Sequence, residues 1–183
     1  MHKDVERILY TEEKLREEVA KAAAWLSERY ENKNPLFIAV LKGSVMFFCD
    51  LVREMKTPVE IDFITSSSYG SGTVSRGMPK IVLDLASSVA GREVVLVEDI
   101  VDSGRTLKNM RDLILKRGAK SFAAVALLDK PSRRVVPVKA DYACFEVGDE
   151  FVVGYGLDYA QKYRNLPYVA VLKKEVYEGG ELN

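Results

Sequence analysis

The sequence predicts an α/β protein built around a doubly wound, mostly parallel sheet. Three runs rich in apolar residues, 36–41, 94–99 and 122–128, predict strands that are buried on both faces. A turn and then a helical pattern or a loop follows each run, which is typical of parallel strands joined by crossover connections. The 183 residues suffice for a real core, and we expect a single domain over 1–183.

The elements ahead of the central strand follow in order. Thr11 can cap a helix whose apolar residues recur up to Tyr30, and a second helix follows the first strand over residues 45–52. Residues 59–65 and 80–85 predict the two strands of a hairpin. This hairpin should add an antiparallel edge to the sheet.

The second half of the chain repeats the alternation. The helical pattern after the central strand covers residues 107–115 and should end at Gly118, because glycine is common just past a helix C-terminus. Residues 142–147 and 168–172 predict two further strands. A polar tail follows the last strand.

Composition limits the possible partners and the compartment. Lys and Arg together number 27, as do Asp and Glu, so no overall field attracts nucleic acid or a membrane. No apolar run could span a bilayer and no signal-peptide core is present, so we expect a cytoplasmic protein. Cys49 and Cys144 have apolar neighbours and should be buried thiols in a reducing compartment. The single histidine, His2, should lie at a frayed terminus, which leaves no histidine base or histidine zinc site.

The turn after residues 94–97 combines anion-binding and acidic features. A helix begins there, and its unpaired N–H groups and dipole suit one phosphate, with Gly104 letting the backbone approach closely. Three acids beside it would repel a phosphate, so they must accept bonds from sugar hydroxyls, hold a divalent cation, or take a proton. A sugar phosphate satisfies both halves of the turn. The acids are Glu98, Asp99 and Asp102, and the phosphate-binding residues are Ser103, Gly104, Arg105 and Thr106. An ordinary helix cap would need far fewer of these groups.

This turn closely resembles the phosphoribosyl-pyrophosphate (PRPP) loop of the type I phosphoribosyltransferases. Residues 154–159 and 164–166 are similar to motifs of the hypoxanthine-guanine branch, and the resemblance covers nearly the whole chain. It implies Mg²⁺-dependent transfer of 5-phosphoribosyl from PRPP to hypoxanthine or guanine, which gives IMP or GMP and pyrophosphate. It also implies a homodimer or homotetramer, and a small hood over the base made from the N- and C-terminal segments.

The resemblance assigns roles residue by residue. Glu98 and Asp99 grip the ribose, Asp102 is the base for the purine N7 proton, and residues 102–106 complete the ribose-phosphate site. The metal ligands are Glu98, Asp99 and Asp158. The pyrophosphate site consists of Leu41, Lys42 and Gly43, with a Leu–Lys peptide that is often cis in the family, and of Arg164. Lys130 and Asp158 lie at the purine, Phe151 stacks on it, and the backbone of Val152 meets its edge. Ser68 and Tyr69 close a flexible lid of about residues 66–79 over the pyrophosphate.

Two alternatives remain open. One is another base specificity, such as xanthine or adenine, although Lys130 and Phe151 argue against adenine. The other is a regulator with a PRPP fold that binds RNA, which should show a basic face. The balanced charge of the chain gives that alternative little support.

Overall fold

The computed structural model describes residues 1–67 and 80–178 of the chain. Its centre is one six-stranded sheet made of β2 (Leu36–Val40), β3 (Glu60–Ser67), β4 (Lys80–Leu83), β5 (Glu93–Val101), β6 (Ser121–Asp129) and β7 (Tyr142–Glu146). The strand order is β4-β3-β2-β5-β6-β7, and every neighbouring pair is parallel except β3 and β4. The predicted fold class, including the antiparallel edge, is confirmed.

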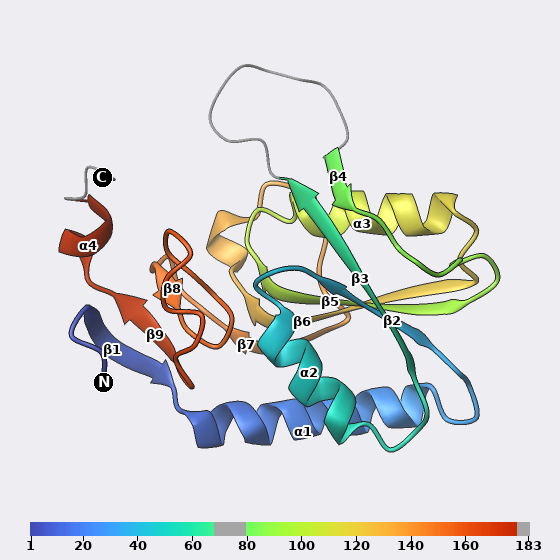
Figure 1. Ribbon diagram of the computed structural model, residues 1–183, viewed down its shortest axis with the longest axis horizontal. Helices are drawn as coiled ribbons and strands as arrows, with labels where there is room; N and C mark the ends of the chain where they lie inside the picture. Colours follow the sequence, from blue (N-terminus) through green and yellow to red (C-terminus); the bar gives the residue numbers. More distant parts are fainter. Residues whose placement is uncertain (68–79, 179–183) are drawn as a thin grey trace.

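Helices cover both faces of this sheet (Figure 1). Helices α1 (Glu12–Arg29) and α2 (Val45–Glu54) lie on one face, and α3 (Arg105–Lys116) lies on the other. Thr11 caps α1 as predicted, because its Oγ1 accepts a bond from the backbone N–H of Lys14 at 3.3 Å. The buried residues of α1 recur at helical spacing and are Leu15, Val19, Ala22, Ala23 and Leu26.

The central strand explains why its sequence is apolar without alternation. Val95 and Val97 of β5 pack into the cluster formed with α1 and α2. Val94 and Leu96 point the other way and pack with the buried residues of α3. Both faces of β5 are therefore core, and each such side chain stabilises the fold by roughly 1.5–3 kcal/mol.

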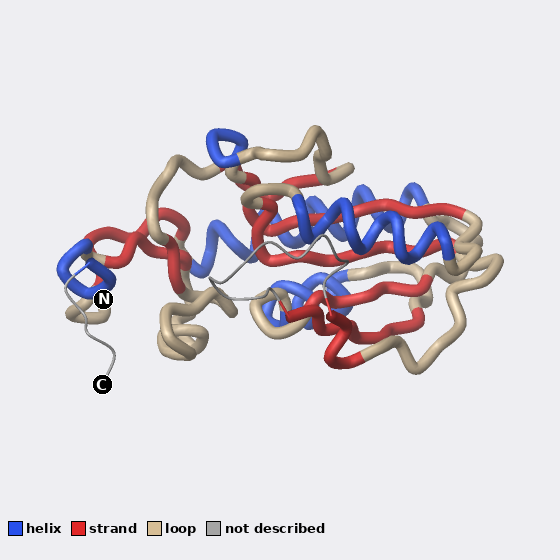
Figure 2. Tube along the Cα trace, turned by 90° about the horizontal axis from the view of Figure 1, so that it is seen from above, coloured by secondary structure: helices blue, strands red, loops and turns tan. Residues whose placement is uncertain are grey.

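A second, three-stranded antiparallel sheet lies at one end of the large sheet (Figures 1 and 2). It consists of β1 (Val5–Tyr10), β9 (Val169–Leu172) and β8 (Val152–Val153), in the order β1-β9-β8. A short helix, α4 (Lys174–Glu178), follows β9, and a 3₁₀ turn (Pro131–Arg133) follows β6. Strand β1 was not predicted, and α4 occupies part of the expected polar tail.

Two expectations about single residues are wrong. Cys49 is exposed on α2, since the buried positions of that helix are Phe47, Phe48 and Leu51, and residue 49 lies on its other side. Cys144 is half-buried, and burial raises the pKa of its thiol to about 12. The backbone N–H of His2 donates to the hydroxyl of Tyr168 at 2.9 Å, so this end of the chain is held rather than frayed.

Among the described residues, no helix is both long enough and apolar enough to cross a membrane.

Candidate active site

The turn between β5 and α3 has the expected strand-turn-helix form. Gly104 precedes the first residue of α3 with a left-handed φ of 80°, and among the described residues the only side-chain acceptor there is the hydroxyl of Ser103, to which the N–H of Arg105 donates at 3.4 Å. Arg105 and Thr106 in the first helical turn are exposed. The start of α3 therefore offers an open set of N–H groups, with the positive end of the helix dipole behind them.

The connection over residues 132–139, to which no role could be assigned from the sequence, holds this turn in place. The Arg134 side chain is only 14% exposed, and its guanidinium donates to the carbonyl of Asp102 at 3.0 Å and to that of Val101 at 3.1 Å. It also pairs with Asp129 and donates to the carbonyl of Val138. The partly buried arginine thus joins the ends of β5 and β6 to the connection after the 3₁₀ turn. An arginine in a polar connection carries no sequence signal of this role.

The same connection explains the glycine in the turn. Val135 and Val136 donate their backbone N–H groups to the carbonyl of Ser103 at 3.0 and 3.2 Å. A Cβ atom on Gly104 would lie 2.8 Å from side-chain carbons of both Arg134 and Val138. Glycine is therefore required at this position because the backbone has a left-handed φ and packs closely against neighbouring side chains. The expected role of this glycine in the close approach of an anion stays a prediction.

Two of the acids, the buried Glu98 and the half-buried Asp99, have carboxyl groups with raised pKa values. Glu98 is 4% exposed, its Oε1 has no hydrogen-bond partner, and burial raises its pKa to about 8, with a further contribution from the charge of Asp99. Burial also raises the pKa of Asp99 to about 6, although backbone N–H groups and the charge of Arg164 partly oppose this. A cation or a set of hydroxyl donors beside these groups would favour their ionised form.

Asp102 lies at the edge of the turn. Its side chain is 45% exposed, while Oδ1 is buried, accepts no hydrogen bond and lies 3.4 Å from Nε of Arg133. Arg133 in turn pairs with Asp149 at 3.1 Å. The carboxylate of Asp102 is therefore held near the surface with acceptor capacity to spare.

The expected pyrophosphate turn meets the acids at Gly43. The Leu41–Lys42 peptide is cis, as the resemblance implied, and Lys42 is exposed. A Cβ atom on Gly43 would overlap Oδ2 of Asp99, and one on Gly156 would overlap the carbonyl oxygen of Gly43. Three segments far apart in the sequence thus come into contact at one glycine.

Arg164 joins the same group of residues. Its guanidinium donates to the carbonyl of Gly156 at 2.7 Å and pairs with Asp158 at 2.7 Å. The charges of both Arg164 and Asp158 act on Asp99. The structure therefore brings together four predicted positions: Gly43, Asp99, Asp158 and Arg164.

The expected purine residues form a second group. Lys130 is 6% exposed, and its ammonium donates to the carbonyl of Glu150 at 2.7 Å. Phe151 is the residue after Glu150, and its ring stacks on that of Tyr177 with a centroid distance of 4.9 Å and an interplanar angle of 23°. Val152 lies in β8 opposite Val171. Ser68 and Tyr69, the expected lid residues, lie outside the described residues.

The expected metal ligands are only partly gathered. The described residues contain no group of three or more His, Cys, Asp or Glu side chains that could hold a metal ion, so Glu98, Asp99 and Asp158 do not form one cluster. The negative charge of Asp158 does contribute to the raised pKa of Asp99. One or two carboxylates completed by substrate phosphates is the usual magnesium arrangement in enzymes that bind phosphates, and these two residues fit it.

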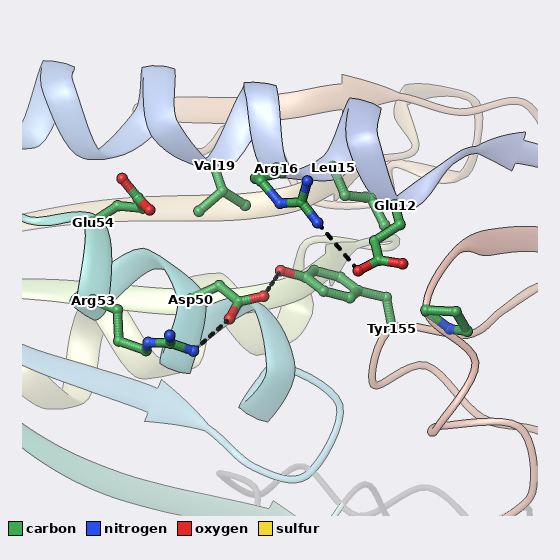
Figure 3. A pocket seen from close by; sticks show the side chains of 9 residues that line it. Glu12, Leu15, Arg16, Val19, Asp50, Arg53, Glu54 and Tyr155 are labelled. Carbon is green, nitrogen blue, oxygen red and sulfur yellow. Dashed lines mark hydrogen bonds and ion pairs between the residues drawn. The ribbon is translucent and has the colours of Figure 1, made fainter.

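A separate cleft of about 360 Å³ lies between α1 and α2 (Figure 3). The hydroxyl of Tyr155 reaches it and donates to Asp50 at 2.6 Å. Around it, Arg16 pairs with Glu12 and Arg53 with Asp50, so its charges satisfy one another. None of the predicted site residues lines this cleft.

Comparison with known proteins finds similarity over nearly the whole chain. A family model described as "Phosphoribosyl transferase domain" matches residues 7–160. A curated hypoxanthine-guanine phosphoribosyltransferase from Streptococcus pyogenes serotype M3 is 49% identical over 177 residues, which cover 97% of this chain and 98% of that protein. The "Bifunctional protein TilS/HprT" of Listeria innocua is 52% identical over 97% of this chain, but the chain spans only 27% of its length.

Solved structures agree. A hypoxanthine phosphoribosyltransferase from Staphylococcus aureus has a TM-score of 0.92 and 44% identity, covering 97% of this chain and 96% of that one. A substituted hypoxanthine phosphoribosyltransferase from Trypanosoma cruzi, in complex with its product IMP, has a TM-score of 0.93 and 39% identity, covering 100% of this chain and 99% of that one.

Proposed function

The chain belongs to the phosphoribosyl transferase family, and we propose that it transfers the 5-phosphoribosyl group of PRPP to hypoxanthine or guanine. The products are IMP or GMP and pyrophosphate. The observation that carries this proposal is the contact between Gly43 and Asp99, which joins the expected pyrophosphate turn to the expected ribose site. Both halves of PRPP thereby find their binding groups on adjoining segments.

The 5′-phosphate would bind at the start of α3. Exposed residues Arg105 and Thr106, with Ser103 beside them, provide N–H and hydroxyl donors at the positive end of the helix. Arg134 keeps the backbone of this turn in place through its bonds to the carbonyls of Val101 and Asp102. Binding the phosphate there would fix the ribose over the acids at the end of β5.

The acids would then act on the sugar. Glu98 and Asp99 accept hydrogen bonds from the ribose hydroxyls, and their charge stabilises the positive charge that develops at C1′ as the bond to pyrophosphate breaks. Both groups have pKa values raised by burial, to about 8 and about 6, so bound hydroxyls and cations would draw them into the ionised form. Attack by the purine nitrogen on the opposite face of C1′ gives inversion.

Asp102 is our candidate for the base that removes the purine N7 proton. Its carboxylate has acceptor capacity to spare and a partly exposed side chain. It lies at the turn that would hold the phosphate, and Arg133 links it to Asp149, which also pairs with Lys130 at 3.7 Å. Such a base is usually worth about 10²–10⁴ in rate.

The leaving pyrophosphate would be bound by Leu41, Lys42, Gly43 and Arg164. The planar guanidinium of Arg164 suits phosphate oxygens, and its present partners are exchangeable acceptors of the same loop. Magnesium is the expected cofactor, with Asp99 and Asp158 as the residues that best fit it and Glu98 as the third candidate. When bound, it would neutralise pyrophosphate and make it a better leaving group.

The purine would lie between Lys130 and Phe151. A buried ammonium that already donates to a carbonyl can donate to the O6 of a 6-oxopurine, whereas the amino group of adenine would leave it facing another donor. The ring of Phe151 is 36% exposed, which leaves a surface on which a base can stack. Asp158 and the backbone of Val152 would meet the edge of the base.

The organisation around the site follows the same proposal. We propose that residues 1–183 form one domain, with the β1-β9-β8 sheet as the hood over the base. A cytoplasmic location and a homodimeric or homotetrameric state are further expectations from the family. Light scattering on the purified protein would measure the second of these.

The test is pyrophosphate release from PRPP with each of hypoxanthine, guanine, xanthine and adenine, with and without Mg²⁺. The proposal expects release with hypoxanthine or guanine that depends on Mg²⁺, and none with adenine. Release with xanthine alone would mean that the enzyme uses xanthine rather than hypoxanthine or guanine. Tight, salt-sensitive RNA binding without nucleotide synthesis would overturn the enzyme altogether.

A further inference from the structure

The ring of Phe151, on which the purine is expected to stack, is itself stacked against another aromatic ring. Tyr177 on α4 stacks on Phe151 with nearly parallel planes, and Tyr159 meets the same ring at 90° with a centroid distance of 5.5 Å. With these neighbours in place, Phe151 keeps 36% of its surface exposed. A parallel stack covers one ring face, so the exposed part includes surface on which a second planar group can lie.

The backbone brings Tyr177 to this place. The N–H of Leu172, the last residue of β9, donates to the carbonyl of Phe151 at 2.9 Å. Lys173 then donates to the carbonyl of Asp4 at 3.0 Å, and α4 starts directly afterwards. The path of the chain from β9 into α4 is therefore held by one bond to Phe151 and one to Asp4, and it brings Tyr177 next to Phe151 although the two residues are 26 positions apart.

We propose that Tyr177 is a positioning residue for the purine: its ring fixes the plane of Phe151, so that base, Phe151 and Tyr177 form a stack of three layers. This inference rests on the function proposed above and adds to it a residue to which neither sequence nor family resemblance gave a role. Tyr177 touches Phe151 and acts through it.

The physical reason is the freedom of a partly exposed aromatic side chain. Phe151 follows a loop and precedes a strand of only two residues, so its own backbone does little to fix its ring. An offset parallel partner favours one ring orientation over others by an amount that corresponds to about two- to tenfold in population. The base would bind that orientation, so the loss of the partner should weaken base binding by the same factor.

The experiment compares Tyr177→Ala, Tyr177→Phe and a control, Glu175→Ala, an exposed residue on the same helix. Steady-state kinetics give kcat and the KM for hypoxanthine and for PRPP, and thermal melting reports the fold. We expect Tyr177→Ala to raise the hypoxanthine KM about two- to tenfold, with the PRPP KM unchanged and the melting temperature lowered by no more than about 2–6 °C. Tyr177→Phe keeps the ring and should behave like the parent, as should Glu175→Ala.

Binding measurements keep the test independent of turnover. Calorimetry with IMP and with ribose 5-phosphate compares a ligand that has the base with one that lacks it. We expect Tyr177→Ala to weaken IMP by the same factor and to leave ribose 5-phosphate unchanged. If the parent protein makes no nucleotide, the proposed function fails, while the IMP comparison still decides the role of Tyr177.

Three outcomes would overturn the inference. Unchanged hypoxanthine KM and IMP affinity in Tyr177→Ala would mean that Phe151 needs no partner. Tighter IMP binding in that variant would mean that Tyr177 occupies the place of the base. A rise in the PRPP KM as large as the rise in the hypoxanthine KM, together with a much larger fall in melting temperature than expected, would make Tyr177 a structural residue only.

Discussion

The carboxylate of Asp99 occupies the space in which a side chain at Gly43 would lie. Gly43 belongs to the turn after β2, and Asp99 lies near the end of β5, the neighbouring parallel strand. Because both strands run in the same direction, their carboxyl ends meet at one edge of the sheet, where open α/β sheets bind ligands. This contact is close enough to make the glycine a requirement of the site.

Gly43→Ala should therefore disrupt the pyrophosphate turn. The added methyl overlaps Oδ2 of Asp99 and has to displace either that carboxylate or the turn. We expect kcat/KM for PRPP to fall by at least about tenfold, the equivalent of about 1.4 kcal/mol of transition-state stabilisation. Gly148→Ala is the matched control, because its new methyl would have no neighbour nearer than 3.8 Å. Equal kinetics in the two variants would contradict this account.

Asp102→Asn should reduce turnover much more than substrate affinity. The amide keeps the shape of the carboxylate but cannot take the N7 proton, so kcat should fall about 10²- to 10⁴-fold. The KM for PRPP should change little. Asp112→Asn, an exposed acid on α3 that pairs with Lys108, controls for the loss of one negative charge. An unchanged kcat would remove Asp102 from the role of base.

Glu98→Gln should alter how stability depends on pH. The folded protein holds a proton on Glu98 up to a pKa of about 8, whereas the unfolded chain releases it near the ordinary value of 4.5. Between these values the folded state binds more protons, so the free energy of unfolding falls as pH rises. The share of Glu98 in that fall is on the order of a few kcal/mol.

The measurement is urea unfolding of parent and variant, without ligand, at pH 5 and pH 8. The parent should lose stability over this interval, and Glu98→Gln, which resembles the protonated acid at both pH values, should lose much less. The smaller contribution of Asp99 remains in both proteins, since its pKa of about 6 is also raised by burial. Parallel curves for parent and variant would contradict a buried, protonated Glu98.

Lys130→Met should weaken purine recognition without affecting PRPP. The ammonium is buried and donates to the carbonyl of Glu150, next to the expected base. A methionine fills a similar volume but cannot donate to O6, so the KM for hypoxanthine should rise by about 10- to 100-fold, as for a lost bond to a charged donor. The PRPP KM serves as the internal control. If both constants rise together, Lys130 acts on the fold rather than on the base.

Arg134→Met should damage both stability and the phosphate turn. Removing the guanidinium leaves Asp129 without its partner and the carbonyl of Asp102 without a donor, while the carbonyl of Val101 keeps only its bond from the N–H of Lys130; this should cost about 3–5 kcal/mol. The PRPP KM should rise as well. Arg133→Met, at an exposed neighbouring position, should leave stability nearly unchanged. Chemical denaturation and PRPP kinetics measure both effects, and equal behaviour of the two variants would show that Arg134 has no special role.

The sequence sufficed for elements whose pattern reflects burial. The apolar runs of β2, β5 and β6 are buried on two faces, and the periodic residues of α1 face the core, so both signals come directly from packing. Strand β1 lacks such a signal because only Val5 is fully buried along it. It exists because β9 provides hydrogen-bond partners from the other end of the chain. Helix α4 has no buried residues and gave no pattern either.

The candidate site divides in the same way. Glu98, Asp99 and Asp102 could be chosen from sequence because acids and a glycine at the start of a helix are a local pattern. The support from Arg134 could not, because its acceptors lie up to 33 positions away and depend on how the strands end together. Tyr177 was missed for a similar reason, since only the path of β9 brings it to Phe151.

The pairing of β1 with β9 sets an order for assembly on the ribosome. Val5 lies opposite Leu172, so β1, which is synthesised before the other described strands, has no partner until β9 has emerged. The six strands of the large sheet are all complete before that moment, and with them the turn that would hold the phosphate. The sugar-phosphate half of the site is therefore synthesised before β9, and Tyr177, the stacking partner of Phe151, follows β9.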